Sequence, residues 1–139
     1  MFRKDKGFTL IELVIIIVVL GILASIAIPR YRNIVAESRE ASARGSLGAL
    51  RSGVSIYYAN AAVTTGTAAW PPIDSIRTVG VVMEQAIPRN PYQADANAPD
   101  SIVTGVTKGV IVGTRGGWAY LAATGEIWPN TNTVGENNW

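Results

Sequence analysis

The chain has 139 residues, 48% of them hydrophobic, and contains neither cysteine nor histidine. This length supports one domain with a modest core. The missing residue types exclude disulfides, thiol nucleophiles and Cys/His zinc sites, and they remove the side chain used most often for acid–base catalysis near neutral pH. We therefore expect a protein that is not an enzyme and needs no cofactor.

The formal net charge of +2 arises at the N-terminus, where Arg3, Lys4 and Lys6 outnumber Asp5. The positive and negative charges after Gly7 balance. No surface is therefore expected to carry the clustered arginine and lysine side chains of a nucleic-acid-binding protein. The sequence predicts no nucleic-acid partner.

The segment 8–28 is apolar and carries one charged residue, Glu12. About 20 apolar residues in a helix span the roughly 30 Å hydrocarbon core of a bilayer, so this segment is predicted to cross a membrane. The basic residues before it favour a cytoplasmic N-terminus, although Arg30 and Arg32 at the other end weaken that orientation. A cleaved secretory signal peptide is the alternative, because a basic start and an apolar middle fit that pattern as well.

Glu12 is the unusual residue of this segment, because a carboxylate at the centre of a membrane helix costs roughly 2.5–3.5 kcal/mol. No basic side chain lies within the span. Cleavage after Gly7 would supply a partner, since the new amine at Phe8 would lie one helical turn from Glu12, on the same face. Between subunits the same pair would fix a register. A glutamate that reaches the membrane edge without a specific partner is the other interpretation.

The stretch "KGFTLIE", residues 6–12, resembles the prepilin signature of type IV pilins and type II secretion pseudopilins. The resemblance is close over residues 1–32 and fades in the C-terminal half. It implies that a membrane prepilin peptidase cleaves between Gly7 and Phe8 and that Phe8 is N-methylated. It also implies that Glu12 neutralises the Phe8 amine of a neighbouring subunit during assembly.

The same resemblance implies partners and a location. The subunit would polymerise with its own copies and with other pilin-like subunits, driven by an ATPase that acts through an inner-membrane assembly platform. The precursor would be a single-pass protein of the bacterial inner membrane, and the filament would be periplasmic or at the cell surface. Both a surface pilus and a type II secretion pseudopilus fit. The missing cysteine pair, which closes the C-terminal region of many pilus subunits, mildly favours the pseudopilus.

Proline shapes the end of the membrane segment. Because Pro29 has no backbone N–H and its ring crowds the preceding turn, we expect a kink or a local loss of helical hydrogen bonds between Gly21 and Pro29. The family resemblance implies that this interval can melt when a filament forms.

Beyond Pro29 the helix is predicted to continue as an amphipathic helix, because apolar residues recur there at spacings of three or four. This apolar stripe would pack against a head domain. Its members are Ala43, Leu47, Leu50, Val54, Tyr57 and Ala61. Glycine is unfavourable in a helix exposed to water, so Gly45, Gly48 and Gly53 indicate either close packing against the head, which we favour, or a helix that is weaker than its apolar stripe implies.

Pro71 and Pro72 forbid continuation of this helix into the head. A short helical turn is expected at 82–86, followed by a proline-rich loop that ends at Asp100. Two aspartates in that loop, Asp95 and Asp100, lack the dense ligand spacing of a calcium site, so we assign no metal.

The last third predicts a small antiparallel sheet with the strands "SIVTGVT", "KGVIVGT", "GWAYLAA" and "EIWPN", separated by glycine-containing turns. Trp118, Tyr120 and Trp128 are expected to pack this sheet onto the apolar stripe, not to stack on a ligand. The final segment, "NTNTVGENNW", is expected to be a mobile tail.

Together these elements predict an α+β, pilin-like fold, in which one long N-terminal helix, half membrane-spanning and half amphipathic, packs against a small C-terminal antiparallel sheet. The expected division has four parts: a leader peptide (1–7), a transmembrane and polymerisation half of the helix (8–29), an amphipathic half (30–61) and a globular head (62–139).

The predicted function is that of a structural subunit in a type IV pilin-like filament. The alternative is a monomeric binding module outside the cytoplasm, either membrane-anchored or released by signal cleavage. In that case Trp70, Tyr92 and the loop 89–100 would contact the ligand.

Overall fold

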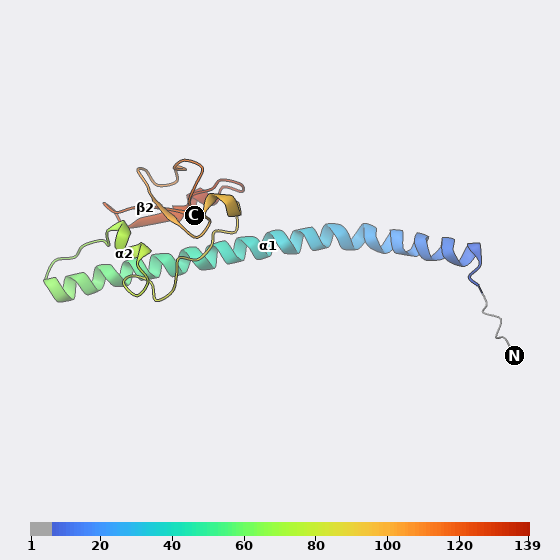
Figure 1. Cartoon of the computed structure of the whole chain (residues 1–139), viewed down its shortest axis with the longest axis horizontal. Helices are drawn as coiled ribbons and strands as arrows, with labels where there is room; N and C mark the ends of the chain where they lie inside the picture. The colour runs from blue at the N-terminus through green and yellow to red at the C-terminus, as the bar shows by residue number, and fades with distance from the viewer. Residues whose placement is uncertain (1–6) are drawn as a thin grey trace. The chain divides into compact units, whose positions relative to one another are not determined.

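The computed structural model describes residues 7–139, and the basic leader residues Arg3, Lys4 and Lys6 lie outside them. Helix α1 (Leu10–Thr65) is followed by a short helix, three strands and two single turns of 3-10 helix (Figure 1). These are α2 (Ile73–Arg77), η1 (Asp95–Asn97), β1 (Ile102–Thr104), β2 (Trp118–Leu121), β3 (Glu126–Pro129) and η2 (Glu136–Asn138). The chain divides into an N-terminal unit that ends at Ser38 and a C-terminal unit that begins at Arg39, and α1 contributes to both.

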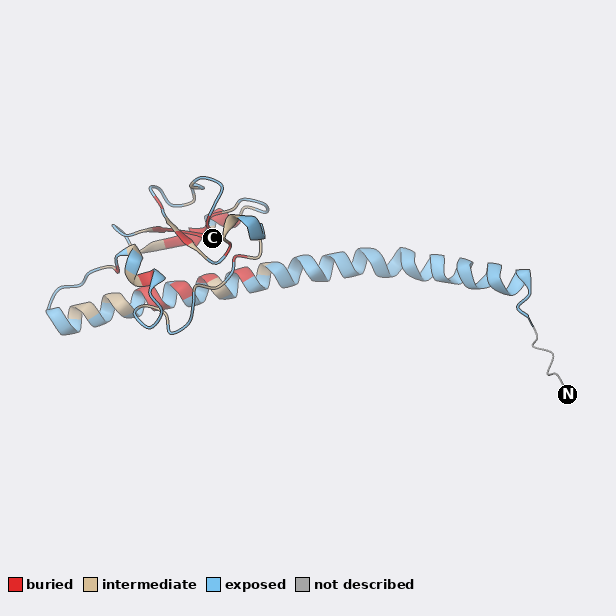
Figure 2. Ribbon diagram, viewed as in Figure 1, coloured by how far each residue is buried: buried red, intermediate tan, exposed pale blue. Residues whose placement is uncertain are grey.

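The N-terminal unit consists of the first part of α1. Figure 2 shows its described residues as exposed throughout. By length and composition α1 is able to cross a membrane, and none of its most apolar stretch is buried. The predicted apolar helix is therefore present, and no described residue of the unit shields its side chains from solvent.

The helix runs without interruption through Gly21 and Pro29. A proline removes one helical hydrogen bond, and the bonds on both sides of it can hold the segment in helical form. Helical structure therefore continues through the interval in which we expected a kink or a local loss of helical hydrogen bonds, and a kink there stays a prediction. Melting of this interval in a filament stays a prediction as well.

The sheet of the C-terminal unit has the strand order β1-β2-β3. Strands β2 and β3 are antiparallel, as predicted, but β1 pairs with β2 in parallel, with Ile102 opposite Trp118. The prediction of a wholly antiparallel sheet was wrong at this pair. Parallel strands need a crossover of about a dozen residues, and the segment 105–117 supplies it.

The predicted strand "KGVIVGT" lies in that crossover and is not a strand. Gly109 and Gly113 adopt positive φ angles of 78° and 62°, which turn the backbone away from the extended form. Val110 and Ile111 between them are exposed. A run of β-branched residues was therefore insufficient to form a strand where the backbone turns twice.

The apolar stripe of α1 forms one side of the core, as predicted. Ala43, Leu47, Leu50 and Val54 are buried, and Tyr57 and Ala61 are partly buried. The core cluster consists of Leu47, Leu50, Val54, Ile76, Ile102, Trp118, Tyr120 and Ile127. The helix continues to Thr65, beyond the expected end near Ala61.

The sheet aromatics divide between its two faces. Trp118 and Tyr120 alternate along β2 and join the core cluster with the helix, which confirms their predicted role. Trp128 pairs with Ala119 and so lies on the opposite face, where its indole N–H donates to the carbonyl of Val110 at 3.1 Å. The prediction that Trp128 packs on the helical stripe was wrong.

Close packing of a helical glycine occurs at one of the three predicted positions. A Cβ added at Gly53 would lie 2.8 Å from the Val82 carbonyl oxygen. At Gly45 and Gly48 no described atom beyond the adjacent helix backbone lies within 4 Å. The prediction was therefore confirmed at Gly53 and wrong, within the subunit, at the other two positions.

Two local predictions in the head also require correction. The helical turn expected at 82–86 does not form, and the short helix of the head is α2 instead. Pro72, the residue before α2, is extended, and proline is suited to the start of a helix. The final segment, expected to be mobile, forms η2 and buries Asn130, Glu136 and Asn137. Its polar side chains find partners in the head, which a composition argument does not reveal.

Candidate membrane and filament-assembly site

The start of α1 is closed by reciprocal hydrogen bonds between Thr9 and Glu12. The Thr9 backbone N–H donates to Glu12 Oε2 at 2.8 Å, and the Glu12 backbone N–H donates to Thr9 Oγ1 at 3.3 Å. The Thr9 hydroxyl also donates to Glu12 Oε2, at 2.7 Å. This arrangement is a capping box, in which two unpaired donors at a helix start are satisfied together. Our sequence analysis missed it, although the T-x-x-E spacing of residues 9–12 is its signature.

The capping box gives Glu12 a partner inside its own subunit. The carboxylate also lies at the positive end of the helix dipole, where a negative charge is favourable. Only Oε2 is engaged, and Oε1 accepts no hydrogen bond from residues 7–139. One oxygen of Glu12 is therefore able to receive a further donor while the cap stays closed.

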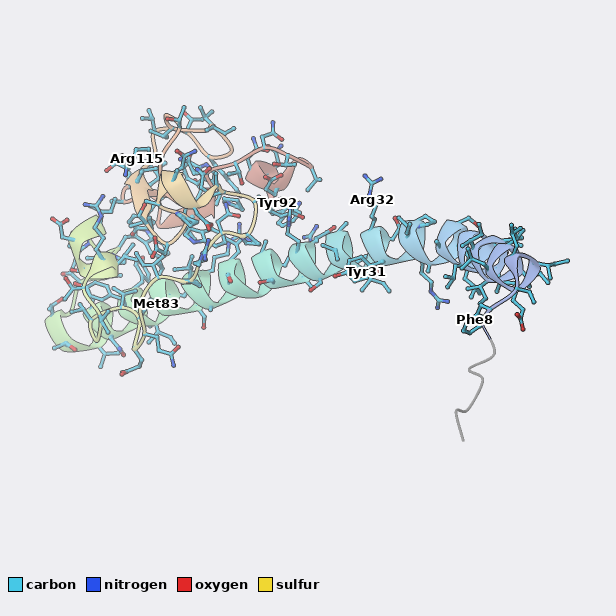
Figure 3. All side chains as sticks on the ribbon, turned by 45° about the vertical axis from the view of Figure 1, so that its right-hand side comes forward. Phe8, Tyr31, Arg32, Met83, Tyr92 and Arg115 are labelled. Carbon is cyan, nitrogen blue, oxygen red and sulfur yellow. The ribbon has the colours of Figure 1, made fainter. Side chains whose placement is uncertain are left out.

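Gly7 and Phe8 precede the first helical residue and are exposed. The Phe8 side chain is 82% exposed, and no described atom lies within 4 Å of the position of a Cβ at Gly7. Figure 3 shows Phe8 at the beginning of the described chain. The bond between these residues thus lies in accessible, non-helical chain, which is the form a peptidase needs.

The head aromatics that a ligand-binding module would use are packed against other aromatic rings of the C-terminal unit. Trp70 stacks on Tyr58 with ring centroids 4.0 Å apart, and Tyr92 meets Trp139 edge to face at 6.2 Å. In the loop 89–100, Arg89 forms an ion pair with Asp95. Residues 7–139 contain no group of three or more side chains that could hold a metal ion.

Two buried asparagines that the sequence analysis missed hold the head loops in place. The Asn90 side-chain amide donates to the Gly117 carbonyl at 2.7 Å, and its carbonyl oxygen accepts from the Tyr92 N–H at 2.9 Å. Asn130 accepts from the Val112 N–H at 2.7 Å and donates to three backbone carbonyls of the crossover. Each side-chain amide supplies hydrogen bonds to loop backbone groups, which have no neighbouring strand to pair with.

Arginines of α1 bind the final segment. Arg44 lies over the Trp139 ring, 3.9 Å from its centroid, and Arg51 donates to the backbone carbonyls of Ile127 and Trp139. Glu136 is fully buried and accepts hydrogen bonds from the backbone N–H groups of Thr133 and Val134. Burial alone would raise the Glu136 pKa, but these hydrogen bonds outweigh it and lower the pKa.

The prokaryotic N-terminal methylation motif family matches residues 2–28, which include Gly7, Phe8 and Glu12. The fimbrial protein EcpC of Eikenella corrodens is 33% identical over 124 residues, which cover 88% of this chain and 76% of EcpC. The chain belongs to the type IV pilin family.

Other relatives of this pilin match it over smaller shares of their own length. The type IV major pilin protein PilE of Neisseria gonorrhoeae is 32% identical over 72% of this chain and 54% of its own length. The type IV major fimbrial protein FimA of Dichelobacter nodosus is 47% identical over 36% of this chain and 32% of its own. The pilin thus spans about half the length of PilE and about a third of FimA. No solved structure matches it.

These relatives are named as pilins and fimbrial proteins, and none of the names denotes an enzyme. The pilin is accordingly a structural subunit of a pilus, with one apolar N-terminal helix long enough to anchor it in a membrane.

Proposed function

We propose that this pilin is made as a single-pass precursor in the bacterial inner membrane, cleaved after Gly7 and N-methylated at Phe8. The observation that carries the proposal is the methylation-motif match over residues 2–28, on a segment where Gly7 and Phe8 are exposed ahead of α1. A prepilin peptidase would perform the cleavage. The leader (1–7), the membrane half (8–29), the amphipathic half (30–61) and the head (62–139) are then the functional parts of the precursor.

Assembly would join Glu12 of one subunit to the Phe8 amine of its neighbour. Among residues 7–139 no cation pairs with Glu12, and its Oε1 atom is available beside the capping box. An unpaired charge in an apolar environment is costly, so pairing on assembly would favour ordered docking over random aggregation. Other pilin-like subunits and an inner-membrane platform with its ATPase would act as partners, and the interval from Gly21 to Pro29 would loosen in the filament.

The names of the relatives favour a surface pilus over a type II secretion pseudopilus, since they are all pilus or fimbrial proteins. This outweighs the missing cysteine pair, which pointed mildly the other way. The packing of Trp70 and Tyr92 against neighbours in the C-terminal unit gives the binding-module alternative no support.

The decisive test of processing is the intact mass and N-terminal residue of protein purified from native membranes. We expect a chain that begins at Phe8 and carries one methyl group on its amine. A chain that begins at Met1, or near Ile28, would contradict the proposal, because neither creates the amine that pairs with Glu12.

The role of Glu12 is tested separately through filament yield and assembly kinetics. We expect Glu12→Ala to abolish filament formation while cleavage after Gly7 continues. Glu37→Ala is the matched control, because Glu37 is also an exposed glutamate of the N-terminal unit. Assembly of Glu12→Ala at the wild-type rate would refute the docking role.

A further inference from the structure

Four consecutive residues of α1 form a polar and aromatic ring directly after the apolar segment. These residues, Arg30, Tyr31, Arg32 and Asn33, are all exposed, and we call them the collar. Successive residues of an α-helix are rotated by about 100°, so four in a row surround the helix. Figure 3 shows the side chains of Tyr31 and Arg32 leaving the helix on opposite sides. The collar is therefore suited to a partner that encircles the helix.

The collar arginines are not engaged in the subunit. Neither Arg30 nor Arg32 forms an ion pair or a side-chain hydrogen bond with any described residue. Three other arginines each pair with an acidic side chain, namely Arg44 with Glu40, Arg77 with Asp74 and Arg89 with Asp95. No acidic residue lies three or four positions from either collar arginine, so the helix itself provides no counter-charge.

We propose that the collar binds the phosphate groups of anionic phospholipids at the exported face of the membrane and thereby fixes the depth of the helix. The proposal rests on the membrane insertion contained in the proposed function. A layer of lipid headgroups surrounds a helix on all sides, whereas a protein partner covers one face. Arginine binds phosphate oxygens through paired N–H donors, and tyrosine favours the membrane interface.

The length of the apolar segment places the collar at the depth of the lipid headgroups. Residues 8–28 extend roughly 30 Å as a helix, so a start at one surface of the hydrocarbon core brings the collar to the other surface. Binding to lipid phosphates would explain why Arg30 and Arg32 lie at the exported end of the apolar segment, against the positive-inside tendency. After cleavage at Gly7 the basic leader residues would be lost, and the collar would supply the basic side chains nearest the apolar segment.

The test uses the full chain in vesicles of phosphatidylcholine with and without phosphatidylglycerol. Spin-labelled lipids report how strongly each lipid associates with the protein. We expect labelled phosphatidylglycerol to associate more strongly than phosphatidylcholine, by about 5-fold for each arginine near the headgroups, from an attraction of about 1 kcal/mol per basic residue. In Arg30→Gln/Arg32→Gln this preference falls by the contribution of the two collar arginines, and the part that remains comes from the basic leader residues Arg3, Lys4 and Lys6, which the full chain keeps.

The matched control is Arg39→Gln/Arg115→Gln, which removes the same charge from two exposed arginines outside the collar. We expect it to keep the wild-type preference. An equal loss in both double variants would overturn the proposal, because net charge and not the collar would then be responsible. An unchanged preference in the collar variant would overturn it as well.

Depth is measured independently through a spin label at Ala36→Cys, since the chain has no cysteine of its own. In phosphatidylglycerol vesicles we expect one defined depth for the otherwise wild-type chain and a shifted or broader distribution for the collar variant. These experiments need neither cleavage nor filaments. If the chain is not processed but the lipid preference is present, only the proposed function is overturned. If the chain is processed but the lipid preference does not depend on the collar, only this inference is overturned.

Discussion

In the C-terminal unit Trp118, Tyr120 and Leu50 are fully buried, whereas in the N-terminal unit Leu10, Ile11 and Ile26 are each more than 60% exposed. Every buried side-chain polar atom of the described residues has a hydrogen-bond partner, and the network lies in the C-terminal unit. The described residues of the first unit, 7–38, form no core of their own. The contrast shows that one part of the chain is stabilised by its own contacts, while the other relies on lipid or on neighbouring subunits.

The strongest test of this contrast removes an aromatic core residue. Trp118→Ala would leave a cavity beside Leu50 and deprive the Pro88 carbonyl of the indole N–H that binds it at 2.7 Å. We expect a loss of about 3–5 kcal/mol in the free energy of unfolding of the head. Chemical denaturation of the full chain in detergent micelles, followed by circular dichroism, measures it. Val14→Ala is the control, and an equal loss there would show that both units share one stabilising core.

A smaller effect is expected at Glu136. Because its pKa is lowered in the folded state, its contribution to stability is present above its usual value of 4.5 and is lost as the pH falls through the lower folded value. Glu136→Gln weakens charge-assisted hydrogen bonds, so we expect a loss of about 2 kcal/mol at neutral pH. Denaturation curves at several pH values check this result. The variant should lose stability less steeply than the wild type below pH 4.5, whereas the exposed Glu84→Gln should follow the wild type.

Glycine substitutions sharpen the comparison within α1, because two sites should respond with opposite sign. Gly53→Ala forces a Cβ against the Val82 carbonyl, which lies 2.8 Å from its position, and should destabilise the head by about 1–2 kcal/mol. Gly48→Ala enters open space and should stabilise the helix by about 0.5–1 kcal/mol. Midpoints of thermal unfolding compare the two variants. Stabilisation by both substitutions would contradict the close contact at Gly53.

The smallest effect is expected at the start of α1. Thr9→Val removes the capping hydroxyl and should destabilise the first helical turn by about 1 kcal/mol. Amide hydrogen exchange in micelles should rise by about 5-fold at Glu12 and Leu13, whose N–H groups bond to Thr9, and Thr64→Val, without a cap, should leave it unchanged. Because Glu12 keeps its charge, Thr9→Val should still form filaments. Loss of filaments would show that the cap, and not only the carboxylate, is needed for assembly.

The parts of the fold that depend on periodic patterns were predictable. The apolar segment and the stripe from Ala43 to Val54 follow directly from composition and the helical repeat. Strands β2 and β3 follow from alternation between aromatic and small residues. The Thr9–Glu12 capping box was also predictable, because T-x-x-E is its sequence signature. Without that prediction, Thr9 was not recognised as the partner of Glu12 inside the subunit.

The parts that depend on contacts between distant loops were not predictable. The parallel pairing of β1 with β2 requires the crossover to bring the chain back, which no local pattern encodes. Asn90 and Asn130 resemble ordinary loop residues in the sequence, yet they are buried because irregular backbone elsewhere needs donors and acceptors. The order of the final segment likewise depends on Arg44 and Arg51 of α1.

The final segment of the head is held on α1 by hydrogen bonds and an arginine–tryptophan contact, in a chain without cysteine. Contacts of this kind separate under mechanical load and form again without any redox chemistry, whereas a broken disulfide needs an oxidant to be restored. A head that is pulled open by tension along a pilus can therefore close again by itself, in oxidising and reducing surroundings alike.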